Sequence, residues 1–77
     1  MELRFLGKDP ESGDHGCPSV WLDEERGELV IQGWKADLAT EAECRKAGPI
    51  PEHEAVVRIP KRMIPLLREA LRGADAL

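Results

Sequence analysis

Apolar and polar positions alternate along residues 2–6, Glu-Leu-Arg-Phe-Leu, and a period of two is typical of a β-strand. A second stretch, residues 20–35, has two apolar runs separated by a polar turn. A third, residues 54–59, is rich in β-branched side chains and predicts another strand. Residues 8–19 hold two prolines and two glycines, so they predict a loop.

The second stretch predicts a β-hairpin in which Gly27 takes the left-handed conformation that closes the turn. A loop of four residues places the apolar side chains of both strands on one face, and the resulting pairs are Leu22 with Leu29 and Val20 with Ile31. A loop of three residues pairs Val20 with a glutamine instead. The four-residue loop buries more apolar surface, so we predict it. The side chains left on the opposite face are Trp21, Val30, Gln32 and Trp34.

Two further stretches have helical patterns. Apolar residues between positions 63 and 71 recur at i, i+3, i+4, i+7 and i+8, the spacing of one helix face. Pro60 precedes this helix, Pro65 fits its first turn, and Gly73 is its expected end. A shorter helix is expected within residues 38–48, where Thr40 and Glu43 match a capping box and a Gly-Pro pair follows.

These elements predict one α+β domain over residues 1–77, a small antiparallel sheet of three to four strands with one C-terminal amphipathic helix. A chain of 77 residues is long enough for one domain and a small core. The expected core is Leu3, Phe5, Val20, Leu22, Leu29, Ile31, Val57, Ile59, Met63, Leu66, Leu67, Ala70 and Leu71.

The charge and the length of the apolar runs limit where the chain acts. The formal net charge of −4 repels phosphate backbones, so direct binding to nucleic acid is not expected. No apolar run is long enough for a membrane-spanning helix or a signal peptide. We therefore expect a cytoplasmic protein whose Cys17 and Cys44 are reduced thiols.

Thiol and imidazole side chains are the candidates for metal binding or catalysis. His15, Cys17, Cys44 and His53 together make a Cys₂His₂ set, the ligand types of structural zinc, but their spacing lacks the usual CxxC pair. Cys17 beside His15 also has the components of an activated thiol, although neighbours in one glycine-containing loop are poorly preorganised. Signatures of the common cofactor-binding and hydrolase families do not occur. We expect a protein without enzymatic activity or cofactor and keep a zinc-binding structural or sensor domain as the alternative.

Large apolar and basic side chains are the candidates for contact with a partner protein. Tryptophan is enriched at binding hot spots, and basic side chains on one side of the final helix can steer an acidic partner. The candidate partner-binding residues are Trp21, Trp34, Lys35, Arg68 and Arg72. Whether the two tryptophans belong to the core or to an interface stays open, as does a homodimer.

Part of the chain resembles a known group of proteins. The run Ser12-Gly13-Asp14-His15-Gly16-Cys17, the hairpin that ends in Lys35-Ala36-Asp37, and a strand leading into a short helix carry the resemblance, over about residues 12–37 and 55–72. These features resemble the small actinomycete domain-of-unknown-function proteins encoded beside helix-turn-helix regulators, a group that includes a small developmental regulator of aerial growth. The strand at 2–6 and the segment 38–54 depart from that pattern. The resemblance implies an accessory protein that modulates a transcription regulator by protein contact, with no enzymatic residues to carry over.

Overall fold

The computed structural model describes residues 1–11, 13 and 16–77. Its elements in chain order are β1 (Arg4–Lys8), β2 (Ser19–Asp23), β3 (Glu28–Gln32), β4 (Trp34–Lys35), α1 (Leu38–Arg45), β5 (Val57–Arg58), the 3₁₀ turn η1 (Lys61–Met63) and α2 (Ile64–Asp75). Strands β1, β2 and β3 form an antiparallel sheet in that order, and β4 and β5 form a two-stranded ribbon. The predicted α+β class is confirmed.

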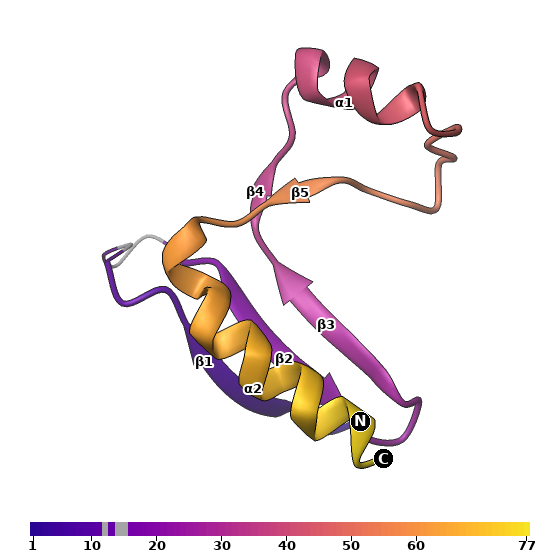
Figure 1. Ribbon diagram of the computed structural model, residues 1–77. Coiled ribbons are helices and arrows are strands. Elements are labelled where there is room, and N and C mark those ends of the chain that lie inside the picture. The colour runs from indigo at the N-terminus through magenta and orange to yellow at the C-terminus, as the bar shows by residue number, and fades with distance from the viewer. Residues whose placement is uncertain (12, 14–15) are drawn as a thin grey trace.

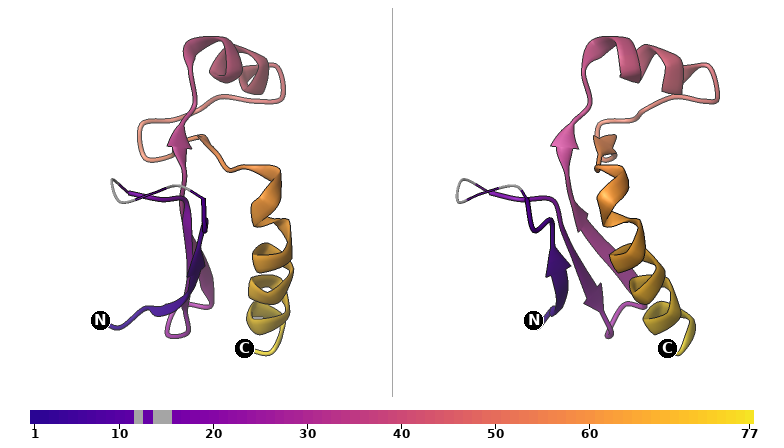
Figure 2. Two further views of the ribbon diagram at one scale, coloured as in Figure 1. Left: turned by 90° about the vertical axis from the view of Figure 1, so that its left-hand side faces the viewer. Right: turned by 60° about the vertical axis from the view of Figure 1, so that its left-hand side comes forward.

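Helix α2 covers one face of the three-stranded sheet (Figure 1). When the sheet is seen edge-on, the helix lies on one side only, and none of the described helices covers the other face (Figure 2). Side chains alternate between the two faces of a strand, so the uncovered face receives every second residue of each strand. This arrangement decides which apolar residues are buried and which are displayed.

The hairpin of β2 and β3 has the predicted register. Leu22 pairs with Leu29, Val20 pairs with Ile31, and the loop between the strands has four residues, Glu24 to Gly27. Gly27 has a φ of 65°, as the turn requires. Asp23 adds a constraint that the pattern did not predict: its buried carboxylate accepts a hydrogen bond of 3.1 Å from the backbone N–H of Arg26 across the turn.

The core lies between β2 and α2. Its buried residues are Val20, Leu22, Met63 and Ala70, with Leu6, Leu29, Leu66 and Leu67 packed around the cluster. Gly7 of β1 lies directly under the helix, where a Cβ atom would come within 2.9 Å of a Leu66 methyl carbon. A glycine at this position therefore lets β1 and α2 approach each other closely.

Five of the predicted core residues are exposed, and the prediction was wrong for them: Leu3, Phe5, Ile31, Val57 and Leu71. Phe5 pairs with Trp21, which places it on the uncovered face, whereas the next residue, Leu6, packs against the core. A bulge between Phe5 and Gly7 shifts the register, so Gly7 also faces α2. Ile31 belongs to the outermost strand, so α2 covers it incompletely. Leu71 lies at the margin of the helical stripe.

The final helix begins as predicted but ends later. Pro60 caps η1, and Pro65 sits in the first turn of α2, where its missing N–H costs no helical hydrogen bond. The expected stop at Gly73 was wrong, because the helix continues to Asp75. Gly73 instead faces the core, and a Cβ there would lie 3.6 Å from a Leu22 methyl carbon.

Residues 34–58 form an arm that extends beyond the sheet and α2 (Figure 1). Gly33 interrupts the predicted strand 29–34, and only Val57 and Arg58 of the predicted strand 54–59 pair, with β4. A Cβ at position 33 would lie 2.6 Å from the carbonyl oxygen of Arg58, so this crossing of two backbones requires glycine.

Helix α1 within the arm has an N-cap different from the predicted one. Asp37 is the cap, and its carboxylate accepts a hydrogen bond of 2.8 Å from the backbone N–H of Thr40, so the expected Thr40 capping box was wrong. The helix ends at Arg45 rather than near Gly48. Helix α1 has no buried residue, and Leu38 at its start is 81% exposed. In the part of the chain that the structure describes, no helix is long and apolar enough to cross a lipid bilayer.

Candidate functional site

The face of the sheet opposite α2 displays a cluster of apolar side chains. We call this cluster the open face; its members are Leu3, Phe5, Trp21 and Val30. Phe5 and Trp21 are directly paired across β1 and β2, and their ring centroids lie 5.8 Å apart with the planes inclined by 53°. This is the spacing of a favourable tilted aromatic pair. Phe5 covers part of the indole yet remains 54% exposed itself.

A groove of about 530 Å³ lies beside the open face, between β3 and the chain leading into β5. We call it the apolar groove; it is lined by Leu3, Trp21, Val30, Ile31, Gln32, Gly33, Lys35, Ala55 and Val57. Lys35 is the one charged residue in this lining, and its ammonium group makes no ion pair or hydrogen bond with any described residue. The groove therefore combines apolar walls with one unpaired positive charge.

Trp34 does not share a hollow with Trp21, although the alternation of the hairpin predicted a common face. It lines a separate pocket of about 250 Å³ together with Cys17, Pro18 and Gln32. The interruption at Gly33 explains the separation, because β4 leaves the sheet there and pairs with β5. Trp34 is 49% exposed, so its indole is accessible to solvent.

The two arginines among the predicted partner-binding residues lie on the other side of the sheet. Arg68 and Arg72 are exposed on α2. Arg72 lines a third pocket, of about 280 Å³, with Arg4 and Glu69. The structure therefore brings Trp21 and Lys35 to one groove and places Trp34, Arg68 and Arg72 elsewhere.

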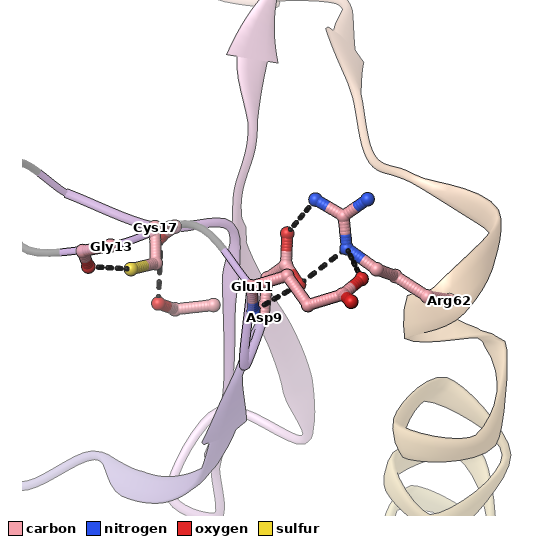
Figure 3. A network of polar contacts seen from close by, with 6 residues as sticks. Asp9, Glu11, Gly13, Cys17 and Arg62 are labelled. Atoms are coloured by element: carbon pink, nitrogen blue, oxygen red, sulfur yellow. Dashed lines mark hydrogen bonds and ion pairs between the residues drawn. The ribbon is translucent and has the colours of Figure 1, made fainter.

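A partly buried ion pair connects the loop after β1 to the turn η1 that leads into α2 (Figure 3). Arg62 donates two hydrogen bonds to the buried carboxylate of Asp9 and also lies 3.2 Å from a carboxylate oxygen of Glu11. The hydrogen bond to Asp9 raises the pKa of Arg62 above its ordinary value. Asp9 is followed by a proline and is held further by a backbone hydrogen bond of 2.8 Å to Pro18, so the pair closes the loop. The sequence pattern did not predict this pair, because its members are 53 positions apart.

The candidate zinc ligands are distributed over different parts of the molecule. Cys17 is buried just before β2, where its thiol donates a hydrogen bond of 3.2 Å to the carbonyl oxygen of Gly13 (Figure 3). Cys44 belongs to α1 in the arm, and His53 lies 3.7 Å from a carboxylate oxygen of Glu54. His15, the fourth candidate and the predicted partner of the Cys17 thiol, lies outside the described residues. Among residues 1–11, 13 and 16–77, no group of three or more potential ligands could hold a metal ion.

Comparisons with known proteins do not extend this picture. No family model, no curated protein and no solved structure matches the chain. The fold and the open face therefore define it as a small α+β domain that displays an apolar sheet face.

Proposed function

We propose that this protein is a non-enzymatic, cytoplasmic accessory protein that binds another protein through its open face. The observation that carries the proposal is the Phe5–Trp21 pair, which presents a large aromatic surface on the sheet face opposite the buried Val20 and Leu22. An exposed aromatic ring stabilises the free monomer less than a buried one, whereas aromatic side chains contribute strongly at protein interfaces. A displayed aromatic pair is therefore typical of a binding surface.

We propose a transcription regulator of the helix-turn-helix class as the partner. The resemblance of residues 12–37 and 55–72 to accessory proteins encoded beside such regulators supports this choice. The net charge of −4 favours contact with the protein over contact with its DNA.

The experiment measures binding of the purified chain to the helix-turn-helix regulator encoded beside its gene, by calorimetry or biolayer interferometry. The informative variant is Phe5→Ser, and the matched control is Leu71→Ser, because these side chains are 54% and 55% exposed. We expect Phe5→Ser to weaken binding by roughly tenfold or more, the effect of losing a hot-spot side chain, and Leu71→Ser to leave it unchanged. Equal affinities of the two variants would show that the open face is not part of the interface. Absence of binding by the unmodified chain would contradict the choice of partner.

A further inference from the structure

The outer edge of β3 is open to another strand. Strand β3 is last in the sheet order, so its outer edge has no strand partner among the described residues. Its centre is the uninterrupted apolar run Leu29-Val30-Ile31, and its pairing with β2 is regular throughout. An edge that is apolar and free of bulges, prolines and lysines is a template for strand addition.

The other edge of the sheet is protected. Strand β1 carries a bulge between Phe5 and Gly7 and begins and ends with the charged residues Arg4 and Lys8. Bulges and charged side chains are the usual means of preventing pairing between sheet edges. The contrast between the two edges selects β3 as the strand that pairs.

We propose that β3 pairs with β3 of a second copy of this chain, antiparallel and across a two-fold axis at Val30. A two-fold axis centred on one residue brings Leu29 opposite Ile31 of the second copy. Leu29 and Ile31 are two positions apart, so their backbone N–H and C=O groups point toward the same edge of β3. Each can therefore form the paired hydrogen bonds of an antiparallel ladder with the second copy. The two three-stranded sheets then form one continuous sheet of six strands.

The side chains of β3 are complementary to themselves in this register. Ile31 is 39% exposed, and on the α2 face Leu29 of the second copy covers it. Val30 meets Val30 of the second copy on the open face, where the two grooves join. Glu28 falls opposite Gln32, so no two like charges are paired across the axis.

The hairpin turn of the second copy approaches the apolar groove. The groove lies beside β3 at the end where the chain crosses into β4, and antiparallel pairing brings the turn of the second copy, which carries Glu25, toward this end, where Lys35 lies. Neither Lys35 nor Glu25 has an ion-pair partner within the described residues. The unpaired Lys35 of each copy thus lies near the acidic turn of the other, and this complementarity favours a second copy over an unrelated peptide. Phe5 lies on β1, at the opposite edge of the sheet from β3, and stays free for the proposed regulator, so the dimer does not depend on that function.

Analytical ultracentrifugation of the full chain from micromolar to millimolar concentration tests the proposal. We expect a reversible dimer. Ile31→Glu places a charge opposite an apolar side chain and should weaken the dimer by roughly tenfold or more. Ile64→Glu is the matched control, since Ile64 is also 39% exposed but lies at the start of α2, and it should leave the dimer intact.

Charge exchange tests the antiparallel orientation. Lys35→Glu alone and Glu25→Lys alone should each weaken the dimer, and the two together should restore it. A chain that stays monomeric at millimolar concentration, or a dimer that survives Ile31→Glu, overturns the proposal. In that case the β3 edge is free for an extended peptide of another protein, or self-association uses a different surface.

Discussion

Arg62 and Asp9 form an ion pair between the turn η1, which precedes α2, and the loop that follows β1. The guanidinium Nε and Nη2 atoms of Arg62 lie 2.6 and 2.5 Å from the two carboxylate oxygens of Asp9, and this two-point geometry is the strongest form of an arginine–carboxylate contact. The Asp9 side chain is fully buried, while that of Arg62 is 40% exposed. The pair therefore fixes the loop after β1 against the first turn of the terminal helix.

Replacement of Arg62 in η1 should destabilise the fold more than replacement of an exposed arginine on α2. Arg62→Ala leaves the buried carboxylate of Asp9 without its cation, and an uncompensated buried charge is costly. Arg68→Ala is the control, because Arg68 is exposed and has no ion pair or hydrogen bond with the described residues. We expect a clearly lower urea midpoint for Arg62→Ala only; equal midpoints would show that the pair contributes little.

Within the hydrophobic core, we predict that Leu22 is essential for the stability of the fold and that Leu71 is dispensable for it. Leu22 is 1% exposed beneath α2, so Leu22→Ala should lower the free energy of unfolding by about 2–5 kcal/mol. Leu71, at 55% exposed, should cost roughly 0.5 kcal/mol or less when changed to alanine. Equilibrium urea denaturation measures both. Similar losses for the two variants would mean that α2 presents a different face to the sheet.

The hairpin and the helix could be predicted from sequence because their patterns are local. The register of β2 against β3 follows from counting apolar pairs over a four-residue loop, and Pro65 marks the first turn of α2. The exposure of Phe5 could not be predicted in the same way. It depends on which residue of β2 it pairs with and on a bulge, and both are set by contacts between segments more than ten positions apart.

Gly33 is predicted to be indispensable for the arm. Gly33→Ala would place a Cβ within 2.6 Å of the Arg58 carbonyl oxygen, so β4 and β5 must separate. The Ala36 amide, which donates a hydrogen bond of 3.2 Å to Val56 across the ribbon, should then exchange faster with solvent. Gly48→Ala is the control, since nothing lies within 4 Å of a Cβ there. Unchanged exchange of the Ala36 amide in Gly33→Ala would contradict the crossing.

The cap of α1 should weaken in acid. The hydrogen bonds from Thr40 lower the pKa of Asp37 in the folded chain. A carboxylate with a lowered pKa contributes stability at pH values above its unfolded pKa, and this contribution is lost as the pH falls through the folded pKa. The Thr40 amide resonance should therefore titrate below the ordinary pKa of aspartate. Asp37→Asn keeps an oxygen acceptor and should abolish the titration; a midpoint at or above the ordinary value would show that the cap is not formed.

The candidate site was predictable in its residue types but not in its grouping. Tryptophan and lysine in the hairpin indicated a binding surface, and the structure does place Trp21 and Lys35 at one groove. Trp34 lies apart from them because the three-stranded sheet ends before Gly33. The sequence shows a glycine at this position but not that the backbone of Arg58 passes close to it. Arg68 and Arg72 were assigned to the same surface without knowledge of which sheet face α2 covers.

The two tryptophans should report on different surfaces of the molecule. Trp34 is 49% exposed, whereas Trp21 is partly covered by the ring of Phe5. Acrylamide should therefore quench Trp34, observed alone in Trp21→Phe, more strongly than Trp21, observed alone in Trp34→Phe. In the Trp34→Phe variant, Phe5→Ser removes the ring that covers Trp21, so quenching of Trp21 should rise. Leu71→Ser in the same variant should leave the quenching of Trp21 unchanged. Quenching of Trp21 equal to that of Trp34 would show that the aromatic pair does not form. If the regulator binds the open face, its addition should shield Trp21 and leave the quenching of Trp34 as it was.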